Sequence, residues 1–153
     1  MMTKTVHIRR TTNTDLPQLY ELMREYIVHF YKQKQPDEQD LKTLIKNLID
    51  DPKLGLQFVA VNQAGGLLGF ATLYFTFSTL KVKQQAILND LFVTADARGN
   101  QLGERLFQTC LSYVRDNDFC SMTWETGKDN EVAQKLYEKM GGEISDWLFY
   151  EIK

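Results

Sequence analysis

Apolar residues in the first part of the chain recur at intervals that predict a strand and then a helix. The strand is expected over Thr5–Thr11. Beyond it, apolar positions are spaced by three or four residues up to about Tyr31, which is the period of one helix face. Asn13 or Thr14 is expected to cap this helix. The residues expected to face inward are Leu16, Leu19, Met23, Ile27 and Phe30.

A polar break over Lys32–Gln35, followed by Pro36, separates this helix from a second one. The same period resumes at about Asp37 and stops at the Asp51–Pro52 turn. The residues expected to face inward from this second helix are Leu41, Leu44, Ile45 and Leu48.

From Leu56 the apolar period changes to two, which is typical of strands. Leu56–Asn62 and Leu67–Phe77 flank the turn 63–66, so we expect a hairpin. Ala86–Val93 is predicted as a third long strand. In the second hairpin strand one face is wholly apolar and carries Leu67, Gly69, Ala71, Leu73, Phe75 and Phe77. The opposite face carries Thr72, Tyr74 and Thr76 and is expected to be only partly buried.

The last third of the chain is predicted to alternate between helices and strands. Arg98–Asn100 is expected to open a helix, Phe119–Thr126 to form a strand, and Asn130–Met140 to form a helix ended by Gly141–Gly142. The tail, Asp146–Lys153, is expected to return to strand. The inward stripes are Leu102, Leu106, Cys110 and Val114 in the first helix and Val132, Ala133, Leu136 and Met140 in the second.

This order of elements predicts one α/β domain over residues 1–153, with a mixed central sheet and helices on its faces. The strand–helix–strand unit over 88–126 is expected to be parallel and right-handed.

Composition narrows the class of protein without changing this picture. The 153 residues are 43% hydrophobic and 25% charged, with a net charge of −2. A nucleic-acid-binding protein would be expected to carry a strongly positive stripe, which this composition does not suggest. Cys110 and Cys120 form neither a disulfide framework nor a zinc spacing. Residues 1–5 lack an apolar signal region, and no run approaches about 18 apolar residues. We therefore expect a cytoplasmic protein with no membrane or nucleic-acid partner.

The segment Asn89–Val93 followed by Arg98–Gly103 is a candidate anion site. A strand that turns into a helix leaves backbone N–H groups unpaired at the helix start, and the helix dipole favours anions there. At Gly99 and Gly103 a side chain would block close approach or packing, and Arg98 is a candidate anion contact. The spacing matches neither the phosphate loop nor the Rossmann turn. Ordinary turn chemistry explains the same glycines equally well.

Asn130 and Tyr137 lie two helical turns apart and therefore on one side of their helix. An asparagine can bond an amide of an extended ligand, and a phenol can protonate a leaving group. The alternative is that Asn130 only caps the helix and Tyr137 only packs.

Together these two segments resemble motifs A and B of the GNAT superfamily of N-acetyltransferases. Motif A is matched at Arg98, Gln101 and Gly103, and motif B at Asn130, Ala133, Tyr137 and Gly141–Gly142. The resemblance covers nearly the whole chain in element order and is most specific over residues 88–142.

Two further stretches resemble branches of the superfamily. Gly69–Phe75 is similar to the diamine acetyltransferases, whereas Trp124–Thr126 and Asp146–Trp147 look more like bacterial and yeast small-amine acetyltransferases. The chain departs from the pattern at Gln101, where motif A prefers glycine, and at Asn89, where the diamine branch has a glutamate. An asparagine cannot accept a proton.

The resemblance implies a mostly antiparallel sheet whose strands 86–93 and 119–126 splay around acetyl-coenzyme A as acetyl donor, with no metal. The diphosphate would bind the N–H groups at the helix start, and the pantetheine would run along the strand, whose N–H groups at Leu91 or Val93 would polarise the thioester carbonyl. The implied cofactor-binding residues are Leu91, Phe92, Val93, Arg98, Gly99, Asn100, Gln101, Leu102, Gly103, Glu104, Asn130 and Tyr137.

The implied activity is transfer of the acetyl group to a primary amine of a small molecule by direct attack. Tyr137 would reprotonate the leaving thiolate, and Asp90 or Glu125 would take the proton of the amine. The acceptor would lie against aromatic and charged residues suited to a cation: Tyr26, His29, Tyr31, Tyr74 and Asp90. Packing of the helix face explains the presence of these residues equally well.

Several alternatives stay open at this point. The same fold can serve as a non-catalytic acetyl-coenzyme A-binding module, as a protein or peptide N-acetyltransferase, or more remotely as a nucleotide-binding regulator. The amine can be a polyamine, an amino acid, an aminoglycoside or a lysine side chain. A homodimer is expected through the late strands, where Trp147, Phe149 and Tyr150 offer apolar surface.

Overall fold

The centre of the structure is a five-stranded sheet whose strands are neighbours in chain order. The computed structural model describes residues 5–153; residues 1–4 of the N-terminal segment, in which no export signal is predicted, lie outside it. The first four strands pair antiparallel and the last pairs parallel to the fourth, as predicted. The strands are β1 (His7–Arg10), β2 (Gly55–Val61), β3 (Leu67–Ser78), β4 (Lys83–Val93) and β5 (Met122–Thr123).

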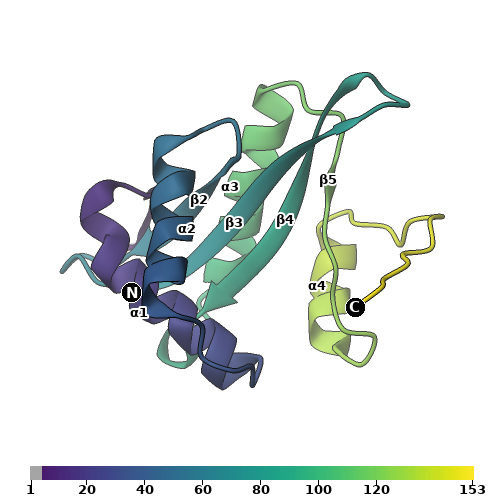
Figure 1. Cartoon of the computed structure of the whole chain (residues 1–153). Helices are drawn as coiled ribbons and strands as arrows, with labels where there is room; N and C mark the ends of the chain where they lie inside the picture. Colours follow the sequence, from purple (N-terminus) through teal and green to yellow (C-terminus); the bar gives the residue numbers. More distant parts are fainter. Residues whose placement is uncertain (1–4) are drawn as a thin grey trace.

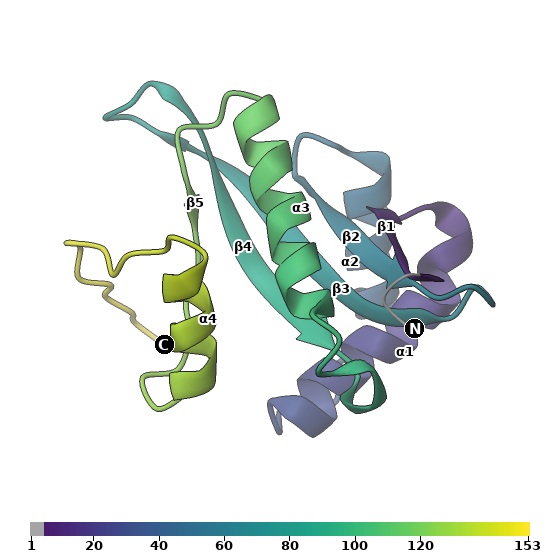
Figure 2. The same cartoon turned by 180° about the vertical axis from the view of Figure 1, so that it is seen from behind.

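Helices cover both faces of this sheet (Figures 1 and 2). On one face α1 (Leu16–Glu25) and α2 (Glu38–Asp50) pack over β2–β4, and on the other α3 (Leu102–Asp116) packs. The last helix, α4 (Glu131–Lys139), lies beside β5. No helix within the described residues is long and apolar enough to span a membrane. The short helical turns are η2 (Asn13–Asp15), η3 (Tyr26–Phe30) and η4 (Ala95–Ala97).

The two helix layers bury both faces of β3, which corrects the predicted half-buried strand. Ala71 and Leu73 pack toward α3, while Phe70 packs toward α1 and α2. Thr72, expected to be partly exposed, is fully buried because α1 covers its face. Phe77, expected on the apolar face, is 74% exposed, since β3 and β4 run past the helices there.

A bulge at Asn89 reverses the alternation of side chains along β4. Leu88 pairs with Leu73, but the next pair joins Asp90 to Thr72, so Asn89 is an extra residue in β4. Leu88 therefore faces the α3 layer, whereas Phe92 faces the α1 layer. A strict period of two would have placed these two residues on the same face.

The first helix is confirmed, with a different start and end. The residue before its first turn is Thr12, whose N–H donates to the Asp15 carboxylate, rather than Asn13 or Thr14. At the other end α1 continues as the π-helical turn η3. In α2 the start at about Asp37 and most of the inward stripe are confirmed; Asp37 is the cap, and its carboxylate accepts from the Asp40 N–H. Leu44 is not inward but 39% exposed, because its neighbours Leu41, Ile45 and Leu48 already fill the contact with α1 and β2.

Two predicted strands are shorter or absent. Of the stretch 119–126 only Met122–Thr123 pairs with β4, because the chain then leaves the sheet toward α4. The tail after Gly142 forms no strand in the described structure, where it pairs with no strand of the sheet. Its apolar side chains are highly exposed: Ile144, Trp147, Leu148, Phe149, Tyr150 and Ile152.

Candidate active site

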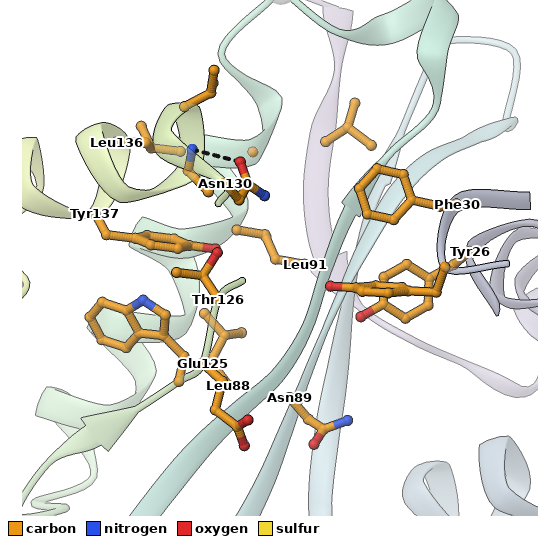
Figure 3. Close-up of a pocket in the computed structure, with 16 residues that line it drawn as sticks. Tyr26, Phe30, Leu88, Asn89, Leu91, Glu125, Thr126, Asn130, Leu136 and Tyr137 are labelled. Atoms are coloured by element: carbon orange, nitrogen blue, oxygen red, sulfur yellow. Dashed lines mark hydrogen bonds between the residues drawn. The ribbon is translucent and has the colours of Figure 1, made fainter. Parts of the chain in front are cut away.

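A cleft opens where β4 and β5 separate. The two strands pair only at Ala86 with Met122 and at Ile87 with Thr123, so the β5 side of β4 has no strand partner beyond Ile87. The gap holds a cavity of about 280 Å³ (Figure 3). The splayed strands implied by the family resemblance are therefore present. Residues from β4, the β5–α4 segment, α4 and η3 line the cavity, among them Leu88, Asn89, Leu91, Val93, Gly103, Thr126, Leu136 and Tyr137.

The turn into α3 is built differently from the prediction. The helix begins at Leu102 rather than at Arg98–Asn100, and its N-cap is Gln101 in the left-handed region at φ 61° and ψ 19°. Gly99 also has a positive φ of 84°. A non-glycine residue costs roughly 1–2 kcal/mol in this region. This strain accounts for the preference of motif A for glycine at the position of Gln101.

Gly99 and Gly103 are not required for helix–strand packing, one of the two reasons predicted for them. A Cβ at Gly99 would meet nothing within 4 Å, so its positive φ is the reason for glycine. A Cβ at Gly103 would touch only Val93, at 3.9 Å, but Gly103 lines the cavity and a side chain there would intrude on it. The N–H groups of the first turn of α3 have no partners within the helix and are the available anion donors.

The other predicted cofactor residues around this turn lie outside the cavity. The Arg98 guanidinium donates to the Val93 carbonyl at 3.0 Å and lies over the rings of Phe30 and Phe92. Leu102 and Phe92 are buried in the core, so only their backbone can meet a ligand. Gly99, Asn100, Gln101 and Glu104 lie along the turn and the first helical residues, outside the residues lining the cavity.

Asn130 and Tyr137 both line the cavity from α4, which confirms that they share one side of the helix. Asn130 is also the helix cap, since its Oδ1 accepts from the Ala133 N–H at 3.2 Å. The cap role predicted as an alternative is therefore present, and it leaves the amide nitrogen at the cavity wall. The predicted stop of α4 is also confirmed: Gly141 has a φ of 92°, and the Gly142 N–H donates to the Tyr137 carbonyl.

Tyr137 is held against two aromatic rings with its hydroxyl directed into the cavity (Figure 3). Its ring centre lies 5.3 Å from that of Trp124 and 5.9 Å from that of Phe107. Burial raises the pKa of Tyr137, and the nearby Tyr31 raises it further. A phenol in this setting stays protonated at neutral pH, which suits a proton donor.

The two candidate bases occupy different environments. Glu125 is exposed and lines the cavity. Asp90 is only 9% exposed and lies behind the cavity wall, where Asn89 donates to it at 3.1 Å. Burial raises the pKa of Asp90, while hydrogen bonds from Thr72, Tyr26 and Asn89 lower it; burial prevails.

Aromatic residues of η3 form the wall opposite α4. Tyr26, Phe30 and Tyr31 line the cavity, and their rings pack on one another with the Tyr26 and Tyr31 centres 5.0 Å apart. Burial raises the pKa of Tyr26 strongly, and Asp90 and Tyr31 add to the effect. Of the residues predicted to contact the acceptor, His29 is exposed and Tyr74 lies outside the cavity lining. Burial, and to a smaller extent the nearby Asp90 charge, raise the pKa of Tyr74 to about 12.

Sequence reasoning missed Phe30 as a site residue. The 3.6-residue period assigned it to the core, but in the π-helical turn the side chain moves to the cavity wall and is 48% exposed. It also missed Trp124, which supports Tyr137 and packs on Gly142, where a Cβ would meet the indole at 2.8 Å. The Gly141–Gly142 pair was a signal for this close approach.

Comparison with known proteins agrees with this geometry. The model of the "Acetyltransferase (GNAT) family" matches residues 16–142. The chain belongs to this family. It is an acyltransferase of the GNAT N-acetyltransferase type, a family that generally uses acetyl-coenzyme A. No cluster of three or more metal-ligating side chains is found in residues 5–153.

Relatives of this GNAT protein cover most of its length. "Uncharacterized N-acetyltransferase YhfO" of Bacillus subtilis (strain 168) is 32% identical over 90% of both chains. "D-amino-acid N-acetyltransferase HPA3" of Saccharomyces cerevisiae is 28% identical over 84% of this chain and 80% of its own. A solved structure described as a probable acetyltransferase superposes with a TM-score of 0.86 at 30% identity, over 96% of this chain and 97% of its own.

Proposed function

We propose that this GNAT protein transfers an acetyl group from acetyl-coenzyme A to the primary amine of a small molecule such as a polyamine or an amino acid. One observation carries the proposal: a single cleft between β4 and β5 brings together the amino end of α3, the Tyr137 hydroxyl and an aromatic wall backed by a carboxylate.

The residues of the cleft suit an acyl-coenzyme A donor, which when bound supplies an acetyl group activated as a thioester. The unpaired N–H groups at the start of α3 bind the diphosphate. The open side of β4 offers backbone groups to an extended chain, because β5 no longer pairs there. The Asn130 amide at the cavity wall meets a polar group of the same ligand.

The acceptor amine lies against Tyr26, Phe30 and Tyr31, whose ring faces attract a cation. Its proton passes to Asp90 through the Tyr26 hydroxyl, or to Glu125 at the cavity rim. As the nitrogen bonds to the acetyl carbon, the carbon–sulfur bond breaks and its electron pair remains on sulfur. Tyr137 gives its proton to this sulfur and takes up the second proton that the nitrogen loses as the amide forms, and no covalent enzyme intermediate is formed.

The yeast relative favours an amino acid among the small amines. Its name describes a D-amino-acid N-acetyltransferase, and it aligns with most of this chain. D-amino acids are therefore the first class of amine to test.

The test is thiol release from acetyl-coenzyme A by the purified protein with a panel of amines. We expect release above the amine-free rate with a polyamine, an amino acid or an aminoglycoside, and titration calorimetry should show donor binding. Release only with a peptide bearing a free N-terminus would make the chain a peptide N-acetyltransferase. Donor binding without release for any amine would leave a non-catalytic module, and no donor binding would overturn the proposal.

We also propose that two copies associate through the tail 144–153. Six of its large apolar side chains are exposed, and the outer edge of β5 has no strand partner within the described residues. A tail of this composition suits the free edge of a second copy. A cytoplasmic location and the lack of nucleic-acid or membrane partners remain predictions from composition.

A further inference from the structure

A row of polar side chains crosses the sheet beneath α1, in a layer that is otherwise apolar. Gln57 of β2 pairs in register with Thr72 of β3, and Thr72 pairs with Asp90 of β4. Gln57 and Thr72 are fully buried and Asp90 is 9% exposed. Three neighbouring strands thus contribute one polar residue each to a continuous line that ends behind the cavity wall.

The hydrogen bonds along this row have a direction. The Gln57 Nε2 donates to the Thr72 Oγ1 at 2.9 Å and contacts the Met23 Sδ at 3.4 Å. Because an amide nitrogen can only donate, it occupies the acceptor side of the Thr72 hydroxyl. The one hydroxyl proton is then left for Asp90, the register partner of Thr72 on β4, and Thr72 and Tyr26 each lower the Asp90 pKa as hydrogen-bond donors.

If Gln57 served only to fill the core, its polar side chain would destabilise the fold relative to an apolar one. The Gln57 Oε1 is buried without a hydrogen-bond partner in the described structure, and such a group is normally destabilising. A leucine of similar size would avoid the cost among Met23, Val59 and Phe70. A buried polar group that packing does not require is a candidate for function.

We propose that Gln57 and Thr72 are positioning residues that keep the Asp90 carboxylate ionised and directed at Tyr26. The inference rests on the proposed function, in which Asp90 takes the amine proton through Tyr26. The titratable groups coupled to Asp90 are Tyr26 from η3 and Tyr74 from β3, both neutral near pH 7 because burial raises their pKa. Within the described part of the chain, no cation is among the groups that lower the Asp90 pKa. The negative charge of the Asp90 carboxylate is therefore stabilised by hydrogen-bond donors, namely Thr72, Tyr26 and Asn89.

The test compares Thr72→Val with Thr72→Ser and Gln57→Leu. Valine keeps the shape but removes the hydroxyl, so the pKa of Asp90 should rise by about one unit. Serine restores the hydroxyl and should restore the pKa. Gln57→Leu should raise the pKa by a smaller amount while leaving thermal stability equal or higher, since it removes the unpaired oxygen.

Two readouts separate this inference from the proposed function. Carbon-13 NMR titration, with Asp90→Asn to assign the signal, follows the Asp90 carboxyl without any substrate. With an active amine, the acidic limb of the kcat/KM profile should move to higher pH in Thr72→Val, with about tenfold less activity on that limb and little change above it. An unchanged NMR titration in folded Thr72→Val and Gln57→Leu would overturn the inference. A shifted titration in a protein that acetylates no amine would overturn only the proposed function.

Discussion

At the scale of single residues, the site departs from its family pattern at two positions, and the structure gives each a physical meaning. Gln101 adopts a left-handed backbone conformation that favours glycine, so this departure lowers the stability of the fold. The N–H groups at the start of α3 remain available to a ligand. Asn89 is the extra residue of the β4 bulge and donates to Asp90, so it supports a carboxylate instead of replacing one.

Replacing Tyr137 with phenylalanine removes the proposed proton donor while keeping the ring packed on Trp124 and Phe107. We expect kcat to fall about 100-fold, within the range for loss of a general acid. The affinity for acetyl-coenzyme A by calorimetry should change less than about twofold, since Tyr137 meets the donor only at its sulfur. Tyr113→Phe, in the packing of Phe75 and Phe119, is the matched control. Unchanged kcat in Tyr137→Phe would remove this residue from the mechanism.

Replacing Gln101 with glycine relieves the strain at the start of α3. Glycine also gains freedom in the unfolded chain, so the net gain in unfolding free energy should be about 0.5 kcal/mol. The exposed Gln108 lies inside the same helix, and Gln108→Gly should instead cost about 1 kcal/mol. Urea unfolding of both variants measures the difference. Equal losses would show that Gln101 is not strained in solution.

At the scale of elements, the sequence predicted best where one period ran for many residues. The helices α1, α2 and α3 and the β2–β3 hairpin were all recognised, because a repeating apolar stripe identifies a helix or strand without knowledge of its partner. The bulge at Asn89 and the π-helical turn η3 were missed because each changes the period by one residue. The strand predicted over 119–126 and the tail failed for another reason: a strand needs a paired neighbour, which composition alone cannot supply.

The same limits apply to the candidate site. Asn130 and Tyr137 were placed together correctly because both lie on one helix with a regular period. The Arg98 side chain stacks on Phe30, a contact between residues 68 positions apart in sequence that no local pattern contains. Long-range contacts of this kind require the fold.

The start of α1 carries a prediction about acid stability. Asp15 accepts two hydrogen bonds from Arg9, at 2.7 and 2.9 Å, and one from the Thr12 N–H. The Arg9 hydrogen bond is the main cause that lowers the pKa of Asp15 below its ordinary value near 3.8. The stabilisation is therefore complete above that value and is lost as pH falls through the lowered pKa of the folded state.

Asp15→Asn should cost about 2 kcal/mol in unfolding free energy at pH 7, because it removes charge-assisted bonds to a buried oxygen pair. The difference from the parent protein should shrink toward pH 2, where the native carboxyl is protonated. Urea unfolding across this range measures it. The exposed pair of Glu21 and Arg24 is the control, and Glu21→Gln should cost well under 1 kcal/mol. A pH-independent difference would contradict the linkage.

At the scale of the whole molecule, the sheet separates two layers of different use. The layer of α1, α2 and η3 carries the aromatic wall proposed for the acceptor, and the layer of α3 and α4 carries the proposed donor site and Tyr137. The exposed tail extends from this second layer (Figure 2). Six of the exposed large hydrophobic side chains of the described structure lie in this tail.

Removing residues 144–153 should convert a dimer into a monomer without unfolding the domain, since the tail contributes no residue to the buried core. Light scattering after size exclusion measures the mass, and circular dichroism checks the fold. The double variant Trp147→Ser/Phe149→Ser should have the same effect with the full chain length. A parent protein that is monomeric at high concentration would exclude association through the tail.

The bulge in β4 also bears on how such an enzyme can diversify. Past Asn89, consecutive residues of one strand face different surroundings: Leu91 and Val93 face the cleft of the proposed donor, while Asp90 and Phe92 face the layer under α1, toward the proposed acceptor wall. Mutations at alternate positions can therefore retarget the amine while the groove for the donor keeps its chemistry. Deletion of Asn89 would turn the cleft-facing residues toward α1 and the α1-facing residues toward the cleft. During evolution of acceptor choice we therefore expect the length of this strand to be kept and its even-numbered side chains to vary.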